Sequence, residues 1–292
     1  MNTRAAIPDT VQADSIWRAW LELDFRQGPR GTRLAGCRHE GPLYVQKAFY
    51  PEGPDRAHAY LLHPPGGMVS GDDLRMSINV HPDASAVITT PGAGRAYRAR
   101  PDRALQHQRN QLTVHENATL EWLPQETLIY PDARAQLDTD IQLAEGARFI
   151  GWEITSLGLP ANQRLFETGE LHQRLQIRQQ GRIVLREHLH LIEPSDELRS
   201  GLAGFQNQPV NGLMIAGPFE GDQKTMVDQL RDHEESATGL AFSGITQVGD
   251  FIVLRSLSDR AEPARKFFTR AWTTLRPALL GIPACEPRIW AT

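Results

Sequence analysis

Alternation of apolar and polar residues with a period of two, repeated along most of the chain, constrains this fold more than any other feature. Between residues 133 and 143, apolar residues and threonine alternate with arginine, glutamine and aspartate, and similar patterns occur at 17–25 and 74–80. Successive side chains of a strand point to opposite faces of its sheet. Each segment therefore predicts a strand with one face on a core and one face in water.

Further strands are predicted from short apolar segments bounded by turn-forming residues. These segments are 42–50, 58–63, 84–90, 105–115, 118–123, 148–154, 171–178 and 183–191. The turns are expected at Pro82-Asp83, Glu116-Asn117, Glu145-Gly146 and Gln180-Gly181. Many short strands joined by regular turns are typical of a sandwich, a barrel or a β-helical stack.

Helical patterns occur only late in the chain. One helix is predicted over residues 224–233. A second is predicted from Asp259, because Glu262 follows three residues later in a capping-box pattern. Pro277 is expected to end or kink this second helix near Arg276, since proline lacks an N–H and crowds the preceding turn.

The order of these patterns suggests three parts of the chain. Residues 1–15 are polar without periodicity and predict a flexible arm. Residues 16–200 predict a β-rich body. Residues 201–292 combine the two helices with strands at 240–245 and 251–257, and predict a smaller α+β portion packed on that body.

Composition excludes several classes of protein. The 292 residues carry a net charge of −4, which disfavours a nucleic-acid partner. No segment approaches the roughly 20 apolar residues that a membrane-spanning helix needs, and the N-terminus lacks the apolar segment of a secretory signal. The two cysteines, Cys37 and Cys285, lie far apart and suit a reducing compartment. We therefore expect a cytoplasmic protein that binds neither membrane nor nucleic acid.

Two glycine-containing loops are candidate sites. Residues 63–73 combine two prolines with three glycines and predict a rigid loop. It is either a structural turn or a loop that presents His63 and Asp72 at a site. The loop at 89–95 likewise allows two interpretations, a turn or a nest of backbone N–H groups for an anion.

Acidic residues on apolar strand faces are the other candidates. Glu187 shares one face of strand 183–191 with leucines, and Glu153 lies between Trp152 and Ile154. An inward carboxylate is costly unless it is paired, bound to a cation or next to internal water. Each acid therefore predicts either a buried pair with arginine or a functional carboxylate.

No catalytic set emerges from the residues. His188 and His190 share the opposite face of strand 183–191, where they form either a nickel or zinc site or a solvated surface. The chain contains no Gly-x-Ser-x-Gly, His-Glu-x-x-His or Gly-x-Gly-x-x-Gly motif.

Several segments together resemble the UreD (UreH) family of urease accessory proteins. The segments that carry the resemblance are 40–46, 49–52, 60–67, 90–93, 120–126, 156–160, 272–277 and 287–292. They occur in the family's order from the first predicted strand to the last residue. One departure is the glycine loop, where Gly94 and Arg95 stand in place of the family's usual hydroxyl residue followed by lysine.

The resemblance implies a mainly β fold of stacked sheets in a β-helical, sandwich-like arrangement with a smaller C-terminal α+β portion. It implies a scaffold without enzymatic activity that binds a UreF-type adaptor, a nickel-carrying UreG-type GTPase and apo-urease. In this family an internal water-filled passage is a proposed nickel route. Asp72, Glu153 and Glu187 stand at family-motif positions of that kind, and His63 is a further candidate ligand. Transient Ni²⁺ is expected, with no tightly bound cofactor.

Two other functions are compatible with the residues alone. One is a metal-dependent hydrolase that uses His188, His190 and a carboxylate, which would hold its metal tightly. The other is a structural or binding module in which the inward acids are salt-bridged.

Overall fold

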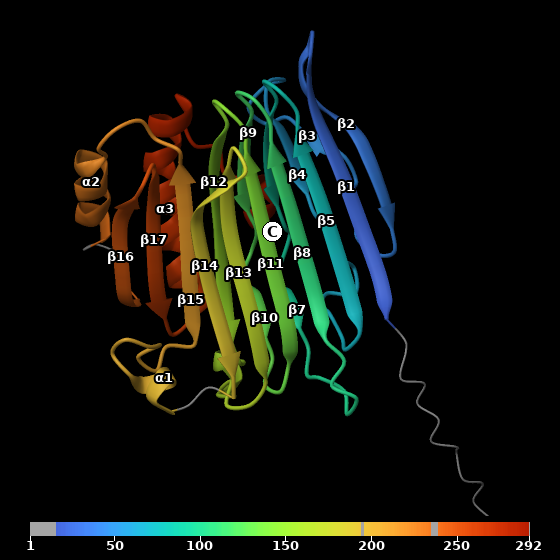
Figure 1. Ribbon diagram of the computed structural model, residues 1–292, viewed down its shortest axis with the longest axis vertical. Coiled ribbons are helices and arrows are strands. Elements are labelled where there is room, and N and C mark those ends of the chain that lie inside the picture. The colour runs from blue at the N-terminus through green and yellow to red at the C-terminus, as the bar shows by residue number, and fades with distance from the viewer. Residues whose placement is uncertain (1–15, 194–195, 235–238, 292) are drawn as a thin grey trace, which may run out of the picture.

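The computed structural model describes residues 16–193, 196–234 and 239–291 (Figure 1). Strands dominate it and form two large sheets, so the mainly β prediction is confirmed. The predicted flexible arm, residues 1–15, lies outside the described residues. Among the described residues, no helix has the length and apolar character needed to cross a membrane.

The seven-stranded sheet has the order β14-β13-β11-β8-β5-β1-β2. Its members are β1 (Trp17–Gly28), β2 (Gly31–Glu40), β5 (Asp72–Val80), β8 (Gln106–Val114), β11 (Arg134–Leu143), β13 (Glu170–Gln179) and β14 (Arg182–Ile192).

The ten-stranded sheet has the order β16-β17-β15-β12-β9-β6-β4-β3, with β10 and β7 joined beside β12. Its members are β3 (Ala48–Phe49), β4 (Ala57–Tyr60), β6 (Ser85–Thr89), β7 (Gly94–Ala96), β9 (Thr119–Leu123), β10 (Thr127–Ile129), β12 (Arg148–Leu157), β15 (Val210–Gly217), β16 (Leu240–Val248) and β17 (Phe251–Ser258).

Of the three α-helices among the described residues, the last is the longest. They are α1 (Asp196–Ser200), α2 (Lys224–Glu234) and α3 (Ala261–Leu280), with 3-10 turns η1 (Pro160–Asn162) and η2 (Arg288–Ala291). Helix α3 packs on β12, β15 and β17, so it covers the outer face of the ten-stranded sheet.

The middle of the molecule is a β-helical coil. The chain passes from β5 to β6, returns through β8 to β9, and returns again through β11 to β12 and β13. Neighbours β5, β8, β11 and β13 are parallel, as are β6, β9 and β12. Antiparallel strands β2 and β14 flank the parallel strands of the seven-stranded sheet. Each coil therefore brings side chains from distant segments to the same level between the sheets.

The predicted turns supply the conformations that join these coils. Asp83, Asn117 and Gln180 have positive φ, as do Gly146 and Gly181. Glycine, asparagine and aspartate tolerate the left-handed region better than most residues, whereas Gln180 adopts it without that preference. The predicted turn positions are confirmed.

Two apolar cores hold the layers together. One fills the space between the sheets, and its best-buried level is formed by Ile78, Leu112, Ile141 and Ile177, all 0% exposed. The other lies between the ten-stranded sheet and helices α2 and α3. The period-two faces predicted from sequence point into the first core, although Trp17 at the strand start is 47% exposed.

The C-terminal segment differs in detail from the sequence prediction. Strands β15, β16 and β17 continue the ten-stranded sheet through β12. The division at residue 200 into a body and a C-terminal portion stays a prediction. Strand predictions were incomplete elsewhere: segment 42–50 contains only β3 and an isolated bridge at Tyr44, while β2, β7, β10 and β15 were missed.

The prediction that Pro277 ends or kinks α3 near Arg276 was wrong about the end, because the helix continues to Leu280. Gly281 terminates it in the left-handed conformation, and its N–H bonds the Pro277 carbonyl at 2.9 Å. Burial of the helix's apolar face outweighs the one hydrogen bond that proline removes.

The predicted cap of α3 was also wrong. The N-cap is Arg260 rather than Asp259, and it makes no side-chain capping hydrogen bond. The Glu262 side chain pairs instead with Lys266 one turn later, at 2.6 Å. That i,i+4 pair uses the carboxylate that a capping box would need.

Candidate functional site

The interior between the sheets changes from apolar to polar along the strands. One level contains Met76, Asn110, Thr139, Leu175 and Glu187 on five adjacent strands. The next level contains Leu74, Gln108, Leu137, Gln173 and Leu189. Polar side chains at these interior positions interrupt an otherwise close-packed core, and two cavities lie here.

The two cavities share part of their walls. The larger encloses about 260 Å³ and extends from the glycine loops to Glu153. The smaller encloses about 150 Å³ and extends from Glu153 to Glu187 and Arg255. Glu153 and Gln173 line both cavities. Glu153 and Gln173 therefore stand in the wall that the two cavities share.

Glu153 lies on β12 and points between the sheets, where two neutral side chains donate hydrogen bonds to its carboxylate. The Thr139 hydroxyl donates to Oε1 at 2.6 Å, and the Gln173 amide donates to Oε2 at 2.8 Å. Asn110 in turn donates to Thr139 at 3.0 Å, and Thr155 donates to Gln173 at 2.9 Å. The network is oriented to stabilise a negative carboxylate through neutral dipoles.

No cationic side chain of the described residues is paired with Glu153, although Arg255 lines the same smaller cavity. Among the described residues, no ion pair involves its carboxylate, and the nearest charged influence is the like charge of Asp138. Burial raises the pKa of Glu153, and the hydrogen bonds from Thr139 and Gln173 offset only part of that rise. A buried carboxylate of this kind gains most from a cation that arrives through the cavities.

Glu187 faces the smaller cavity but is already paired. Its Oε1 contacts Arg255 Nη2 on β17, and the Glu187 side chain is 30% exposed. The structure thus brings Glu153 and Glu187 to opposite walls of one cavity. The sequence predicted for each acid either a buried pair with arginine or a functional carboxylate. Glu187 has an arginine partner, although the pair is partly exposed, and Glu153 forms no ion pair with a described residue.

His63 lines the larger cavity but not the smaller one. Burial lowers its pKa, which favours the neutral imidazole. Its Nε2 and the Trp122 Nε1, both at this cavity, are buried without a hydrogen bond to any described residue. Buried polar atoms in a polar cavity are typically satisfied by water.

Asp72 does not join these residues. Its carboxylate accepts the Val69 N–H at 2.8 Å, and it lines neither cavity. Burial raises the pKa of Asp72. The residue fastens the end of the 63–73 loop, so its geometry fits the structural interpretation of that loop.

Both glycine loops border the larger cavity. A Cβ on Gly67 would lie 2.7 Å from both Arg95 Cβ and Tyr97 Cε2, so only glycine allows the two loops to approach this closely. Arg95 Nη1 donates to the Gly66 carbonyl at 3.0 Å. Gly94 stands where the family usually has a hydroxyl residue. A Cβ at this position would lie 3.3 Å from Thr127 Oγ1, and both residues line the larger cavity.

The histidines of β14 lie on the outer face of the seven-stranded sheet. The His190 ring lies 3.7 Å from that of His172 and 6.0 Å from that of His188, measured between centroids. Within the described ranges, no group of three or more His, Cys, Asp or Glu side chains could hold a metal. The hydrolase interpretation therefore finds no support in this geometry.

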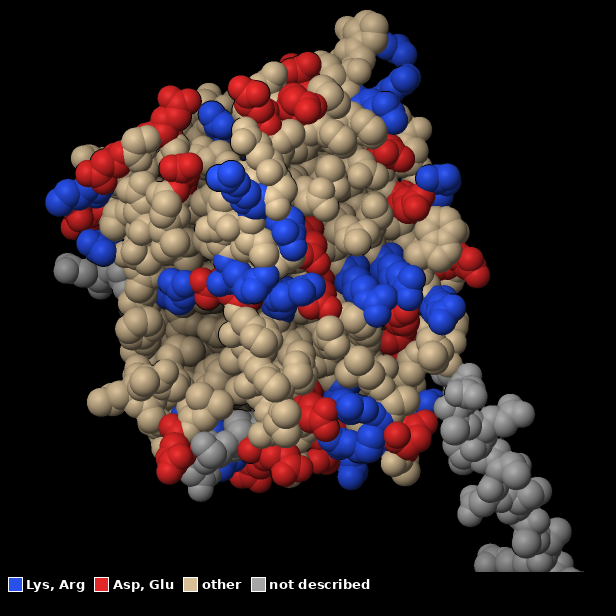
Figure 2. Space-filling model, viewed as in Figure 1, with Lys and Arg blue, Asp and Glu red and all other residues tan. Residues whose placement is uncertain are grey.

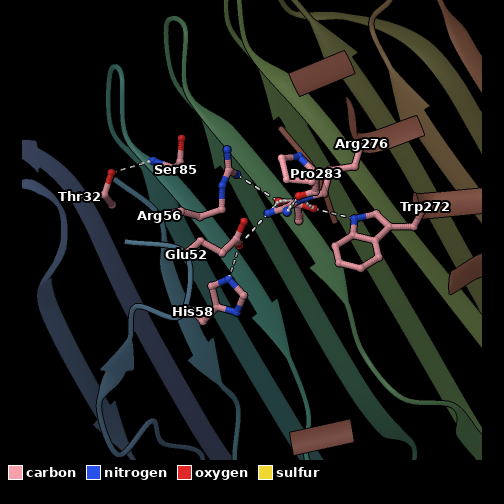
Figure 3. Close-up of polar contacts among 9 residues, drawn as sticks. Thr32, Glu52, Arg56, His58, Ser85, Trp272, Arg276 and Pro283 are labelled. Carbon is pink, nitrogen blue, oxygen red and sulfur yellow. Dashed lines mark hydrogen bonds and ion pairs between the residues drawn. The ribbon is translucent and has the colours of Figure 1, made fainter. Parts of the chain in front are cut away.

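Sequence reasoning missed a second buried acidic cluster, on the opposite face of the ten-stranded sheet (Figure 3). Glu121 is 0% exposed. It accepts hydrogen bonds from Arg56 at 3.1 Å, Arg276 Nε at 2.9 Å and Trp272 Nε1 at 2.7 Å. Glu121 interrupts an apolar strand and Arg276 follows the apolar stripe of α3, so the signal was present in the sequence.

Glu52 extends this cluster. Its Oε1 lies 2.6 Å from His58 Nε2 and 2.7 Å from Arg276 Nη2. Burial acts to raise the pKa of Glu52, but the bonds to His58 and Arg276 outweigh it and lower the pKa to about 2. The cluster joins α3 to β4 and β9 and has the character of a structural ion-pair network.

The described residues that line the two cavities offer oxygen ligands and an imidazole but no activated nucleophile. Carboxylate, amide and hydroxyl oxygens suit hydrated divalent cations, and imidazole suits nickel as well as zinc, copper and iron. Because these groups are spread along two cavities, a cation would meet them one or two at a time. The arrangement suits weak, successive contacts rather than tight binding.

Comparison with known proteins gives a consistent result. The sequence profile of the family described as UreD urease accessory protein matches residues 18–291. A protein named urease accessory protein UreD from Marinomonas sp. is 50% identical over 95% of this chain and 91% of its own length. Proteins of the same name from Alkalilimnicola ehrlichii and Methylobacillus flagellatus are 40% and 38% identical, over 98% and 100% of this chain and 95% and 99% of their own lengths.

Proposed function

The chain belongs to the UreD family of urease accessory proteins and so has a role in urease maturation, and from this premise we propose that it is a nickel-conducting scaffold. In this proposal it has no catalytic activity of its own. It holds a UreF-type adaptor, a nickel-carrying UreG-type GTPase and apo-urease in one cytoplasmic assembly. Nickel crosses the interior of the protein on its way to the urease site.

One observation carries the proposed route: a half-buried carboxylate with neutral hydrogen-bond donors only, Glu153, stands in the wall that two interior cavities share. A carboxylate that served only the fold would gain more from a fixed arginine, as Glu121 does. In our proposal the passing Ni²⁺ supplies the missing positive charge for a short time. His63 and Glu187 then form the two ends of the route.

The same groups explain why nickel would not stay. A conduit must bind its ion strongly enough to admit it and weakly enough to release it. Glu153 supplies one carboxylate, and its other neighbours here are neutral oxygens and amides. Glu187 is occupied by Arg255, which competes with the cation for the carboxylate. Neither acid has the further ligands that would make a tight site.

The test is urease activation with a Glu153→Gln variant. The chain is co-expressed with the adaptor, the GTPase and apo-urease, and each complex is purified and assayed for urease activity and nickel content. Gln has the size of Glu and keeps one acceptor oxygen, but it removes the charge. We expect E153Q to assemble like the wild type and to activate urease poorly. Glu116→Gln, an exposed change of the same chemistry, should activate normally.

Two results would contradict this proposal at different points. Normal activation and nickel loading with E153Q would exclude the route through Glu153 while leaving the scaffold role intact. Failure of the wild-type chain to bind any of the three partners, with urease activated equally well in its absence, would remove the scaffold role itself.

A further inference from the structure

The outer face of the seven-stranded sheet carries a band of arginines that the nickel route does not use. Helices α2 and α3 lie on the other sheet, and Figure 2 shows basic side chains crossing the uncovered face. We call this feature the arginine band. Its members are Arg18, Arg75, Arg109, Arg174 and Arg186, together with Asp73, Asp138 and Asp140.

The parallel register aligns the band in rows. Trp20, Arg75, Arg109, Asp138, Arg174 and His188 are register partners on six successive strands. With about 4.8 Å between strands, this row extends roughly 24 Å across the sheet. A row of this length is comparable with the width of a standard protein interface, which covers about 800 Å² on each partner.

The acids of the band lie beneath its guanidinium groups. The side chains of Asp73 and Asp138 are each 13% exposed, whereas those of Arg75, Arg109 and Arg174 are 50%, 42% and 39% exposed. Five arginines against three aspartates give the band a charge of +2, and at its β1–β2 edge Glu40 accepts a hydrogen bond from Trp20 while Glu22 is paired with Arg38. What the band presents to solvent is therefore mainly positive charge.

The aspartates also fix the arginines in place. Asp73 Oδ2 accepts from Arg75 at 2.6 Å, and Arg174 spans Asp138 at 3.2 Å and Asp140 at 3.1 Å. Side chains held in this way lose little conformational entropy when a partner binds. Arginine and tryptophan are the residues most often responsible for interface affinity, and Trp20 lies in the same row.

We propose that the arginine band docks an acidic surface of a partner protein, one that presents a row of Asp and Glu side chains. A nucleic acid fits less well, because the chain as a whole carries a net charge of −4 and would repel an extended polyanion outside the band. The inference goes beyond the proposed nickel route and does not require it. Binding should be steered by charge and should weaken as salt rises.

The experiment measures binding of the purified full chain to fluorescent poly-L-glutamate over a range of salt concentrations. We expect salt-sensitive binding by the wild type and a loss of about tenfold or more for Arg75→Glu with Arg109→Glu. The milder pair Arg75→Gln with Arg109→Gln should show an intermediate loss, and thermal unfolding checks that both variants fold. The matched control is Lys224→Glu with Lys266→Glu, exposed on helices α2 and α3, and should bind like the wild type.

Three results would overturn the proposal. The first is equal binding by the wild type and both arginine variants. The second is an equal loss in the lysine control, which would show that only net charge matters. The third is tighter binding to double-stranded RNA than to poly-L-glutamate with the same dependence on Arg75 and Arg109, which would assign the band to nucleic acid. None of these results depends on nickel transfer, so the proposed function is tested separately.

Discussion

Glu121 and Glu153 lie on neighbouring strands of one sheet, and their surroundings are opposite. Glu121 on β9 faces helix α3 and is held by Arg56, Arg276 and Trp272. Glu153 on β12 faces the sandwich interior and is held by Thr139 and Gln173, beside two cavities. One acid is neutralised by fixed cations and the other is stabilised only by dipoles.

The comparison separates a carboxylate that stabilises the fold through fixed ion pairs from a carboxylate that can still bind a cation. A buried carboxylate with fixed guanidinium partners gains little from a further cation, and losing a partner leaves an uncompensated charge. A carboxylate that is removed from water and has only neutral donors keeps its affinity for a cation. While no cation is bound, the desolvation of its charge lowers the stability of the folded protein. Substitutions at the two positions should therefore affect stability in opposite directions.

The largest effect is expected for Glu121→Gln. This change leaves Arg56 and Arg276 buried without a full counter-charge, and breaking such a pair typically costs about 3–5 kcal/mol. Urea unfolding at neutral pH measures the difference. A loss below about 1 kcal/mol would mean that the cluster does not stabilise the contact between α3 and the sheet.

A somewhat smaller effect, with a defined pH window, is expected for Glu52→Gln. The pKa of Glu52 is about 2 in the folded protein against 4.5 for an ordinary glutamate, a difference worth about 3 kcal/mol. That stabilisation is present above pH 4.5 and is lost as pH falls towards 2. The free energies of unfolding of wild type and E52Q should converge over this interval, and a gap that stayed constant with pH would contradict the assignment.

Glu153→Gln should change stability in the opposite direction. Because the pKa of Glu153 is raised in the folded state, ionisation costs stability as pH rises above the ordinary value of 4.5. E153Q has no such cost, so its free energy of unfolding should gain on that of the wild type with increasing pH. Denaturant titrations at several pH values measure the trend. A trend of opposite sign would indicate a cationic partner for Glu153.

The smallest effect is expected for Glu187→Gln, which tests an intermediate case. The Glu187–Arg255 pair is partly exposed, with side-chain exposures of 30% and 41%. Exposed pairs of this kind contribute about 0–1 kcal/mol. Thermal unfolding should therefore show little change. A loss as large as that of E121Q would place Glu187 among the structural charges.

The fold was largely predictable because its signal is local. The alternation at 133–143 became β11, and the turn residues at 116–117 and 145–146 joined the coils as expected. Two of the four missed strands carry weak patterns: β7 and β10 have three residues each, and β7 begins inside a glycine loop. Their strand geometry comes from parallel pairing with each other and with β12, which no local pattern encodes.

The candidate site was predictable only in part, because the side chain that pairs with each acid comes from a distant part of the sequence. Glu153 and Glu187 were recognised as inward acids from the residues around them. The sequence could not show that Arg255, 68 positions away, neutralises one and that no described cation reaches the other. Asp72 looked similar in sequence, but its own loop uses its carboxylate.

The cluster around Glu121 also has a consequence for synthesis of the chain. Arg276 follows Glu121 by 155 positions and Glu52 by 224. Since proteins are made from the N-terminus, most of the β-helical coil leaves the ribosome before this guanidinium exists. Until then both carboxylates must stay hydrated or be met by Arg56 and His58 alone. We therefore expect the outer face of the ten-stranded sheet to become buried late in folding, when α3 docks on it. Until α3 has docked, we expect the growing chain to depend on chaperones.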